Sequence, residues 1–282
     1  MKNKWLAAPY VVWMAIFVVA PLILVVVFAF TGQDGGVTLD NFSNMGTYVP
    51  AFRNSFILAF VATAICILIG YPLAYFLSRE KLIVRKVAMM LIMLPMWMNF
   101  LLRTYAWMSI LEDNGLINQA LSAIGFFDLF NAVFGTNIQS FQMINTQGAI
   151  VLGMVYNFLP FMVLPIFSVI DKIDPKVVEA AQDLGASSSM VFRKVIFPLS
   201  LPGVLSGVTM VFIPSVSTFA LSRLLGGGKT LLLGDLIEMQ FLGNAYNPHL
   251  GSAIALVMMV IVLILMAIMN RFGEGEEGVA VL

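Results

Sequence analysis

Few residues in this chain have the types and spacing that covalent chemistry needs. The segment from Gly226 to Thr230 ends in Gly-Lys-Thr, as does the P-loop that holds nucleotide phosphates. A P-loop also needs a glycine five residues before its last glycine, and Arg223 occupies that position. His249 is the only histidine, so neither a cluster of histidine metal ligands nor a triad backed by a second histidine can be built. We therefore expect no catalytic residues, no metal site and no nucleotide site.

The composition is that of a membrane protein. Apolar residues make up 60% of the 282 residues and charged residues only 11%, and the mean hydropathy is +0.96. A soluble surface needs about 25% charged residues, so lipid must cover much of this chain. The formal net charge of zero and the dispersed basic residues exclude nucleic acid as a partner, because phosphate binding needs a clustered positive surface.

Six segments meet or approach the roughly 20 apolar residues of a spanning helix. They are Leu6–Phe30, Phe56–Leu77, Val87–Leu111, Ala149–Ile170, Leu199–Leu221 and Ser252–Met269. The first follows Met-Lys-Asn-Lys, as in a signal peptide, but its apolar stretch is too long and no small-residue cleavage site precedes the loop after it. We interpret it as a retained anchor. The sequence predicts an all-α integral membrane protein with six transmembrane helices in one domain, residues 1–282.

Proline interrupts several of the predicted spans. Pro72, Pro95, Pro160 and Pro214 each free a backbone carbonyl that must find a partner in a neighbouring helix or in water. This pattern favours a bundle of helices that lines a pathway.

The distribution of Lys and Arg predicts the orientation. Two basic residues precede the first span, four lie between the second and third, four between the fourth and fifth, and one follows the last. The opposite side carries Arg53, Arg223 and Lys229. By the positive-inside rule both termini are cytoplasmic. Residues 171–198 then form a cytoplasmic loop, and residues 31–54, 112–147 and 223–250 form extracytoplasmic loops.

Two of the remaining segments have a composition of their own. The loop 112–147 contains no Lys or Arg, and its stretch Gly115 to Ile124 has helical apolar spacing but is too short to span. We expect that stretch to lie at the membrane surface and to help receive a binding protein. The tail 273–282, with three glutamates among glycines, is predicted to be disordered.

The predicted spans lack the charges that ion-driven carriers use. None of the six apolar cores contains Asp or Glu, and the only ionisable candidate at membrane depth is Arg103. Counting about 1.5 Å per residue from Val87 along a straight span places Arg103 roughly 24 Å along it, near the outer face. An anchoring role at the interface is then favoured over a role in a pathway.

The predicted cytoplasmic loop 171–198, which contains the segment Glu179 to Pro198, has the signals of two short helices joined by a turn. Asp174 can cap the first helix with Pro175 at its first position, and Gly185 permits a left-handed exit. Ser187 or Ser188 can start the second helix, which Pro198 and Pro202 are expected to end. The segment could dock on a partner or lie as an amphipathic helix on the inner leaflet.

The same segment resembles the EAA motif of ABC importer permeases. Glu179, Ala180 and Ala181 are followed after three residues by Gly185 and then by a hydrophobic-x-hydrophobic-Pro ending at Pro198. The resemblance implies that this loop couples the permease to an ATPase subunit, with Glu179, Ala180, Ala181, Gly185 and Pro198 as its signature residues. It also implies a type I, MetI-like importer fold.

Two further segments resemble permease subunits of spermidine/putrescine importers. They are LPMWMNFLLRTYAWMSIL from Leu94 to Leu111 and LSRLLGGGKTLLLGDLIEMQFL from Leu221 to Leu242. This resemblance implies a bacterial plasma-membrane complex with a homologous PotC-like permease, a homodimer of a PotA-like ATPase and an extracytoplasmic PotD-like polyamine-binding protein. ATP and Mg²⁺ would be used by the ATPase, and this chain would bind only membrane lipid, cargo and its partner proteins.

Some residues could hold a polyamine, because carboxylates and aromatic faces attract ammonium groups. Aromatic residues with polar neighbours are Trp97 and Asn99, Tyr105 with Trp107, and Tyr156 and Asn157. Carboxylates expected near the outer mouth are Glu112, Asp113, Asp235 and Glu238. An interfacial aromatic belt and solvated loop charges would give the same pattern.

The sequence leaves two alternatives to a polyamine importer subunit. One is the same importer architecture with another small solute as cargo, such as a phosphonate or a metal chelate. The other is an ion-driven secondary carrier, which the missing intramembrane carboxylates disfavour.

Overall fold

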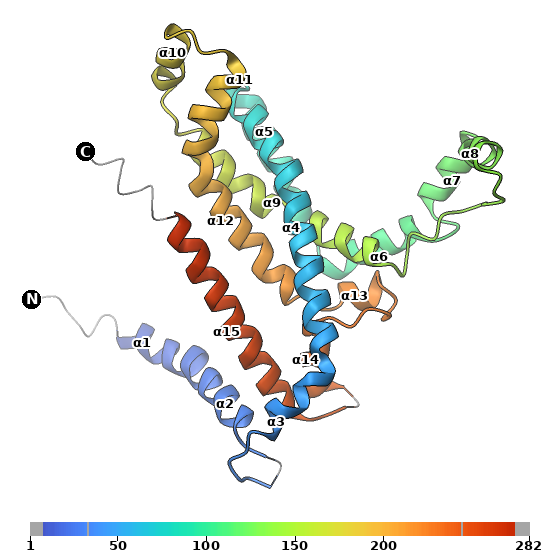
Figure 1. Ribbon diagram of the computed structural model, residues 1–282, viewed down its shortest axis with the longest axis vertical. Helices are drawn as coiled ribbons and strands as arrows, with labels where there is room; N and C mark the ends of the chain where they lie inside the picture. The colour runs from blue at the N-terminus through green and yellow to red at the C-terminus, as the bar shows by residue number, and fades with distance from the viewer. Residues whose placement is uncertain (1–7, 33, 244, 274–282) are drawn as a thin grey trace, which may run out of the picture.

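The computed structural model describes residues 8–32, 34–243 and 245–273, which form a bundle of long helices (Figure 1). Five helices are long and apolar enough to cross a membrane, and a sixth span results if one bent pair counts as one. Within these described ranges the only strand-like pairing is an isolated bridge between Thr31 and Val37. The predicted all-α, six-span fold class is therefore confirmed.

Three helices form the centre of the bundle: α4 (Val49–Ser78), α9 (Gln147–Ile170) and α12 (Phe197–Val216). They approach closely where small residues face a neighbour. A Cβ atom added at Gly207 would lie 2.8 Å from the sulfur of Met162 and 3.1 Å from its carbonyl oxygen. Small residues at such contacts let helix backbones pack together in a membrane, where lipid offers no hydrophobic drive for association.

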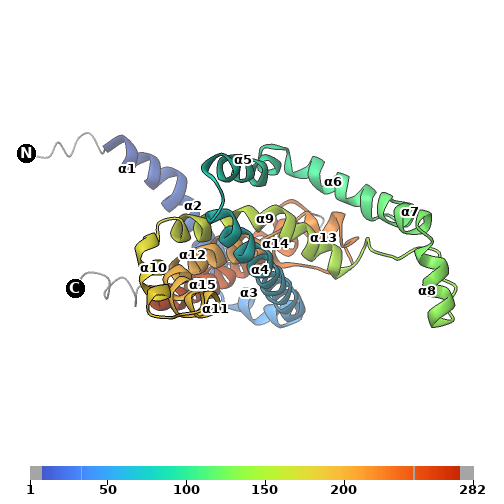
Figure 2. The same ribbon diagram turned by 90° about the horizontal axis from the view of Figure 1, so that it is seen from above.

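The terminal helices lie on one side of this core (Figures 1 and 2). The N-terminal helix consists of α1 (Ala8–Met14), a π-helical turn (Ala15–Val19) and α2 (Ala20–Ala29). α2 packs chiefly against α15 (Pro248–Gly273), and the ring of His249 lies 5.3 Å from that of Phe28. Residues 274–282 of the expected disordered tail lie outside the described residues, and Gly273 ends α15.

The straight third span that we expected from Val87 to Leu111 is wrong. The chain forms α5 (Leu82–Met93), a 3₁₀ turn (Leu94–Trp97) and α6 (Phe100–Leu111). The bend between Leu82–Trp97 and Phe100–Ala123 is 94°. Met98 and Asn99 have extended backbone, and the Asn99 side chain accepts hydrogen bonds from the amides of Leu101 and Leu102, at 2.8 and 3.4 Å. The span bends because Asn99 caps a new helix there.

Beyond α6 the chain continues into an arm that projects from the bundle (Figures 1 and 2). The arm contains α7 (Leu116–Ala123) and α8 (Phe126–Phe134), so the short helix expected between Gly115 and Ile124 is confirmed. Asn118 donates to the carbonyls of Glu112 and Phe141 and accepts from the Phe141 amide, which ties the returning strand of the arm to α7.

Short helices connect the spans at both ends of the bundle. They are α3 (Asp40–Ser43) with a 3₁₀ turn (Asn44–Tyr48), α10 (Pro175–Asp183), α11 (Ser188–Val191) with a π-helical turn (Phe192–Ile196), α13 (Leu221–Leu224) and α14 (Leu233–Leu242).

The helix that starts after Ser187 does not end at Pro198, as we had expected. It runs without interruption from Ser188 to Val216, through both Pro198 and Pro202. The π-helical turn from Phe192 to Ile196 ends two residues before Pro198, where the usual backbone donor is missing. Wider turns of this kind accommodate a change in the hydrogen-bond ladder without breaking the helix.

Candidate coupling segment and substrate path

The helix α10 begins and ends where its residue types predict. The side chain of Asp174 accepts a hydrogen bond from the amide of Lys176 at 2.9 Å, and Pro175 occupies the first turn. At the other end Gly185 adopts a left-handed φ of +84°. The amide of Gly185 donates to the Gln182 carbonyl at 2.8 Å, and the amide of Ala186 donates to the Ala181 carbonyl at 3.1 Å. This pair of bonds is a Schellman motif, which fixes the turn towards α11.

The next helix begins at the serine that we identified from the sequence. The hydroxyl of Ser187 accepts a hydrogen bond from the amide of Met190 at 3.4 Å. Only two residues, Ala186 and Ser187, separate Gly185 from α11. The helix–turn–helix prediction is therefore confirmed up to the expected stop at Pro198.

One face of this segment packs into the protein. Val178, Ala181, Ala186 and Val195 contact a buried cluster that includes Met162 of α9 and other residues of α4, α9 and α12. An amphipathic helix that merely rested on a lipid surface would turn these side chains towards lipid. The packing favours the docking loop over the interfacial helix.

The opposite face of the segment is exposed. Glu179, Ala180 and Gly185 lie on the surface, and the side chain of Leu184 is 89% exposed. A Cβ atom added at Gly185 would meet no atom within 4 Å, so the tip is also open. We did not single out Leu184 from the sequence, although it lies off the apolar stripe of α10, directly before the turn. Pro198 is half-buried inside the continuous helix.

A hollow of about 360 Å³ lies behind α10, between the ends of α4 and α9. Glu179 and Gln182 line it from α10, and Arg79 lines it from the end of α4. The guanidinium of Arg79 lies 4.6 Å from the centroid of the Tyr75 ring, a cation–π contact. Arg79 thus places positive charge in the hollow that Glu179 borders.

An ion pair ties the loop between α4 and α5 to the same end of the bundle. Arg85, at the start of α5, pairs with Asp171, the residue after α9, and its Nε donates to the Glu80 carbonyl at 2.6 Å. Both side chains are partly exposed, so the pair contributes little stability by itself. The pair instead fixes a position, because it holds the start of α5 close to Asp171, shortly before α10 begins.

The predicted path residues divide into two groups. Tyr156 and Asn157 lie on α9, where the Tyr156 ring contacts Trp107 edge-to-face at 5.4 Å between centroids. Asn157 is 6% exposed and donates to the Gly153 carbonyl at 2.7 Å. Trp97 and Tyr105 are instead exposed, by 76% and 50%.

Asn99 has its side-chain oxygen committed to the cap of α6, which gives it a structural role at the bend. Of the aromatic and amide candidates, Tyr156 and Asn157 thus lie within the bundle on α9, and Trp107 contacts Tyr156.

Asp235 and Glu238 belong to a network of charges within the chain. Asp235 is 2% exposed and accepts hydrogen bonds from the hydroxyl of Ser222 and, at 3.4 Å, from the amide of Leu232. The Nε of Arg223 lies 3.4 Å from Asp235, and its Nη2 contacts Glu238. The network joins α13 to α14, and it compensates the charge of both carboxylates locally.

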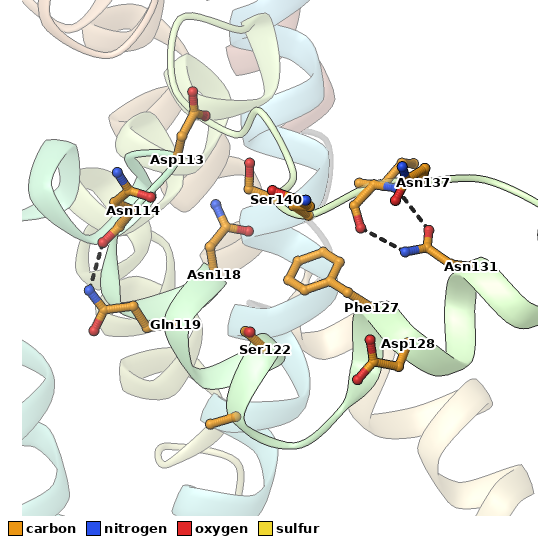
Figure 3. Close-up of a pocket in the computed structure, with 13 residues that line it drawn as sticks. Asp113, Asn114, Asn118, Gln119, Ser122, Phe127, Asp128, Asn131, Asn137 and Ser140 are labelled. Atoms are coloured by element: carbon orange, nitrogen blue, oxygen red, sulfur yellow. Dashed lines mark hydrogen bonds between the residues drawn. The ribbon is translucent and has the colours of Figure 1, made fainter.

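Glu112 and Asp113 follow α6 and belong to the arm. Asp113 lines an open hollow of about 690 Å³ with Asp128 and several amides, and Figure 3 shows Asn118 and Phe127 between the two carboxylates. Glu112 is exposed, and its carbonyl accepts from Asn118. The residues that line this hollow do not include Asp235 or Glu238, so the four carboxylates that we expected near the outer mouth form two groups.

The Gly-Lys-Thr segment lies in a loop between two helices. Gly226 to Thr230 follow α13 and precede α14, and Lys229 is exposed. A P-loop would connect a strand to a helix that points its N-terminus at the phosphates. The surroundings of this segment are therefore those of a connecting loop.

Comparison with known proteins identifies the family of the chain. The family described as "Binding-protein-dependent transport system inner membrane component" matches residues 66–274. The chain is 34% identical, over 92% of its length and 90% of the relative's, to the spermidine/putrescine transport system permease protein PotB of Haemophilus influenzae. It is 33% identical, over 88% of its length and 90% of the relative's, to PotB of Escherichia coli.

A solved structure has the same fold. A chain of a bacterial ABC transporter involved in the import of the acidic polysaccharide alginate superposes with a TM-score of 0.80. The match covers 98% of this chain and 97% of that one at 17% sequence identity. Because the family match and the relatives both extend over most of its length, this chain belongs to the binding-protein-dependent transport system inner membrane components.

Proposed function

We propose that this chain is a non-catalytic permease subunit of an ATP-binding cassette importer that carries polyamines such as spermidine and putrescine into a bacterial cell. One structural observation supports the importer mechanism above the others. The exposed tip at Leu184 and Gly185 belongs to a helix whose other face packs against α4, α9 and α12. The cargo assignment rests on the relatives, which are about one third identical over nearly the whole chain and are named for polyamines.

The coupling step follows from the mechanics of the segment. A groove on an ATPase subunit would take the exposed face of α10, with Leu184 as an apolar anchor and Glu179 at its edge. Because the helix from Ser188 to Val216 is continuous, a push on α10 and the Gly185 turn moves α12 as a lever. The close contact of Gly207 with Met162 transmits that motion to α9. Closure of the ATPase would thereby convert an inward-open path into an outward-open one.

Chemistry on ATP is assigned to a partner. The only P-loop-like segment of this chain lies between two helices and has arginine at a required glycine position. We infer a homodimer of a PotA-like ATPase below the coupling segment, a homologous PotC-like permease beside this chain, and a PotD-like binding protein that delivers the polyamine. The permease would supply a path and no covalent step.

The proposed orientation puts both termini and α10 in the cytoplasm. The basic residues of the loops support it, since Arg79, Arg85, Arg193 and Lys194 all lie at the α10 end of the bundle. The arm from α6 to α8, with its acidic and amide-lined hollow, would then face outward, where it could meet the binding protein.

Reconstitution into vesicles tests the proposal. Vesicles with this chain, its partner permease, the ATPase and the binding protein should take up spermidine only when ATP is supplied, without an ion gradient. Uptake by this chain alone would refute the importer class. ATP hydrolysis stimulated by the binding protein of another solute, without spermidine uptake, would retain the class and discard polyamines as cargo.

A matched pair of variants tests the coupling surface in the same vesicles. Leu184→Asp should abolish ATP-driven uptake and release the ATPase from the membrane, because a carboxylate would enter an apolar contact. Leu242→Asp is the control, since Leu242 is 84% exposed at the end of α14. Both changes lie on the surface and should leave folding within about 0.5 kcal/mol of wild type. Equal uptake by the two variants would remove Leu184 from the coupling surface.

A further inference from the structure

Arg103 lies inside the bundle and not near one end of it, as a straight third span would have required. Its guanidinium carbon is 5.9 Å from the centroid of the Tyr156 ring. Tyr156 is nine residues into α9, which begins at Gln147, so it lies roughly 14 Å from that end of the helix. The bend before α6 therefore brings the arginine to membrane depth, beside Tyr156 of the predicted path.

The guanidinium lacks the acceptors that such a position requires. Its Nε and Nη1 atoms are covered by protein and have no hydrogen-bond partner among the described residues. None of the ion pairs among the described residues includes Arg103. The Oδ1 of the buried Asn157 is also without a partner, so this junction between α6 and α9 is incompletely satisfied. Unpaired buried donors of a charged group cost several kcal/mol, so an acceptor is required.

A carboxylate is the acceptor that best suits the guanidinium of Arg103. A guanidinium presents parallel N–H donors that match a carboxylate in charge and shape. This chain has no Asp or Glu in α6, and none in α9. Since none of the ion pairs among the described residues includes Arg103 either, we look for the carboxylate outside the chain.

The surroundings indicate which molecule supplies it. The neighbouring side chains of α6 are uncovered, with Leu101, Leu102 and Tyr105 exposed by 45%, 63% and 50%. An apolar helix face next to an incompletely paired charge is the surface of a helix–helix contact in which the partner carries the opposite charge. A cationic cargo could not serve as the counter-ion, because it would be repelled.

We propose that Arg103 pairs with a carboxylate in a spanning helix of the second permease subunit, and that this ion pair holds α6 against that subunit at the edge of the path. The pair would neutralise Arg103, so that a polyamine could pass. This inference rests on the proposed two-permease importer.

Charge exchange tests the pair in the assembled importer. Arg103→Glu should lower ATP-driven uptake at least about tenfold, because it would oppose two carboxylates in a low-dielectric site. Arg103→Met should also lower uptake, since it leaves the partner's carboxylate unpaired, and Arg103→Lys should retain part of it. Lys229→Glu is the control for the same change of charge, in an exposed outer loop.

The decisive step changes each Asp and Glu in the partner's spans to Lys, one at a time, in the Arg103→Glu background. One exchange should restore most of the uptake, and cysteines at those two positions should cross-link once Cys66 is replaced. The pair is refuted if Arg103→Met has wild-type uptake, or if no exchange restores uptake. It is also refuted if Arg103 variants lose only the uptake of an anionic solute that the wild-type importer carries, because Arg103 would then contact cargo.

The cross-linking arm does not depend on cargo. If the wild-type importer carries another solute, the polyamine proposal fails, and the exchange is repeated with that solute. If the chain works without a second permease, both proposals fail, whereas a working two-permease importer without the cross-link refutes only the ion pair.

Discussion

Two prolines in this chain have opposite effects on the helices that contain them. Pro95 lies in a 3₁₀ turn just before the third span breaks, with a bend of 94° between Leu82–Trp97 and Phe100–Ala123, whereas at Pro198 the helix continues from Ser188 to Val216. The difference lies in the neighbouring residues. Four residues after Pro95, Asn99 caps a new helix with its side chain. Before Pro198, a π-helical turn accommodates the missing donor, and Ile196 anchors that turn in the core.

The comparison shows that a proline does not by itself determine whether a helix ends. It removes one hydrogen bond and one conformation, and the residues beside it decide how the chain responds. A capping side chain stabilises a new helix start and hence a bend, and buried apolar side chains stabilise continuation. In this chain the first arrangement precedes the arm that projects from the bundle, and the second joins α11 to α12 in one continuous helix.

The largest effect is expected from converting the continuous joint into a hinge. Ile196 is 3% exposed, and Ile196→Gly removes its packing and adds a flexible residue before Pro198. The free energy of unfolding in detergent should fall by about 3 to 5 kcal/mol, and ATP hydrolysis should no longer drive uptake. The control is Leu199→Gly, because Leu199 is 48% exposed and should cost only about 1 kcal/mol. Equal losses in the two variants would show that core packing does not maintain the joint.

A substitution at Gly185, in the turn between α10 and α11, should have the next largest effect. Gly185→Val forces a β-branched residue into a φ of +84°, at a cost of roughly 1 to 2 kcal/mol. Since nothing lies within 4 Å of the new Cβ atom, the effect should come from the backbone and not from a clash. ATP hydrolysis should persist while uptake falls, measured as transported solute per ATP. Gly185→Asn should be nearly normal, and normal coupling in Gly185→Val would separate the turn from coupling.

Removal of the Asn99 cap should destabilise the start of α6 by about 1 kcal/mol. Asn99→Ala removes the acceptor for the amides of Leu101 and Leu102, which costs roughly 0.5 to 2 kcal/mol at helix starts. Spin labels on α5 and α6 should report a broader distribution of distances, whereas Asn99→Ser should retain the native one. An unchanged distribution in Asn99→Ala would mean that the arm is held elsewhere.

The smallest effects should come from the prolines themselves. Pro95→Ala should leave the bend in place because the cap at Asn99 remains, and Pro198→Ala should leave the joint straight because it is already helical. Each should change the free energy of unfolding by less than about 1 kcal/mol. The same spin-label distances check both variants. If Pro95→Ala straightens the span, the proline and not the cap determines the bend.

Local signals in the sequence were sufficient to predict the helix–turn–helix of α10 and α11. Asp174, Pro175, Gly185 and Ser187 occupy the capping positions that their types predict, because caps depend on residues within one or two turns. The positions of the long spans also followed from hydropathy, since the lengths required by a bilayer are fixed.

Tertiary relations could not be predicted in the same way. The 94° bend depends on a choice between two helical paths at Asn99, and hydropathy is the same for both. The depth of Arg103 follows from that bend, so the count along a straight helix was wrong. The local pairing of Asp235 with Ser222 and Arg223 depends on the fold of the loop between α13 and α14, which has no periodic signal. Which residues line a substrate path stays a prediction.

The packing of the N-terminal helix has a consequence for how the chain is made. α2 ends at Ala29 and its main partner α15 begins at Pro248, so the 218 residues from 30 to 247 are synthesised between them. At about 5 to 20 residues per second the first helix waits roughly ten to forty seconds for this contact. During that time lipid is the solvent for its side chains. The large apolar residues from Tyr10 to Phe28, many of them exposed, are compatible with that surrounding. The packing of α2 is thus completed only after α15 has been synthesised.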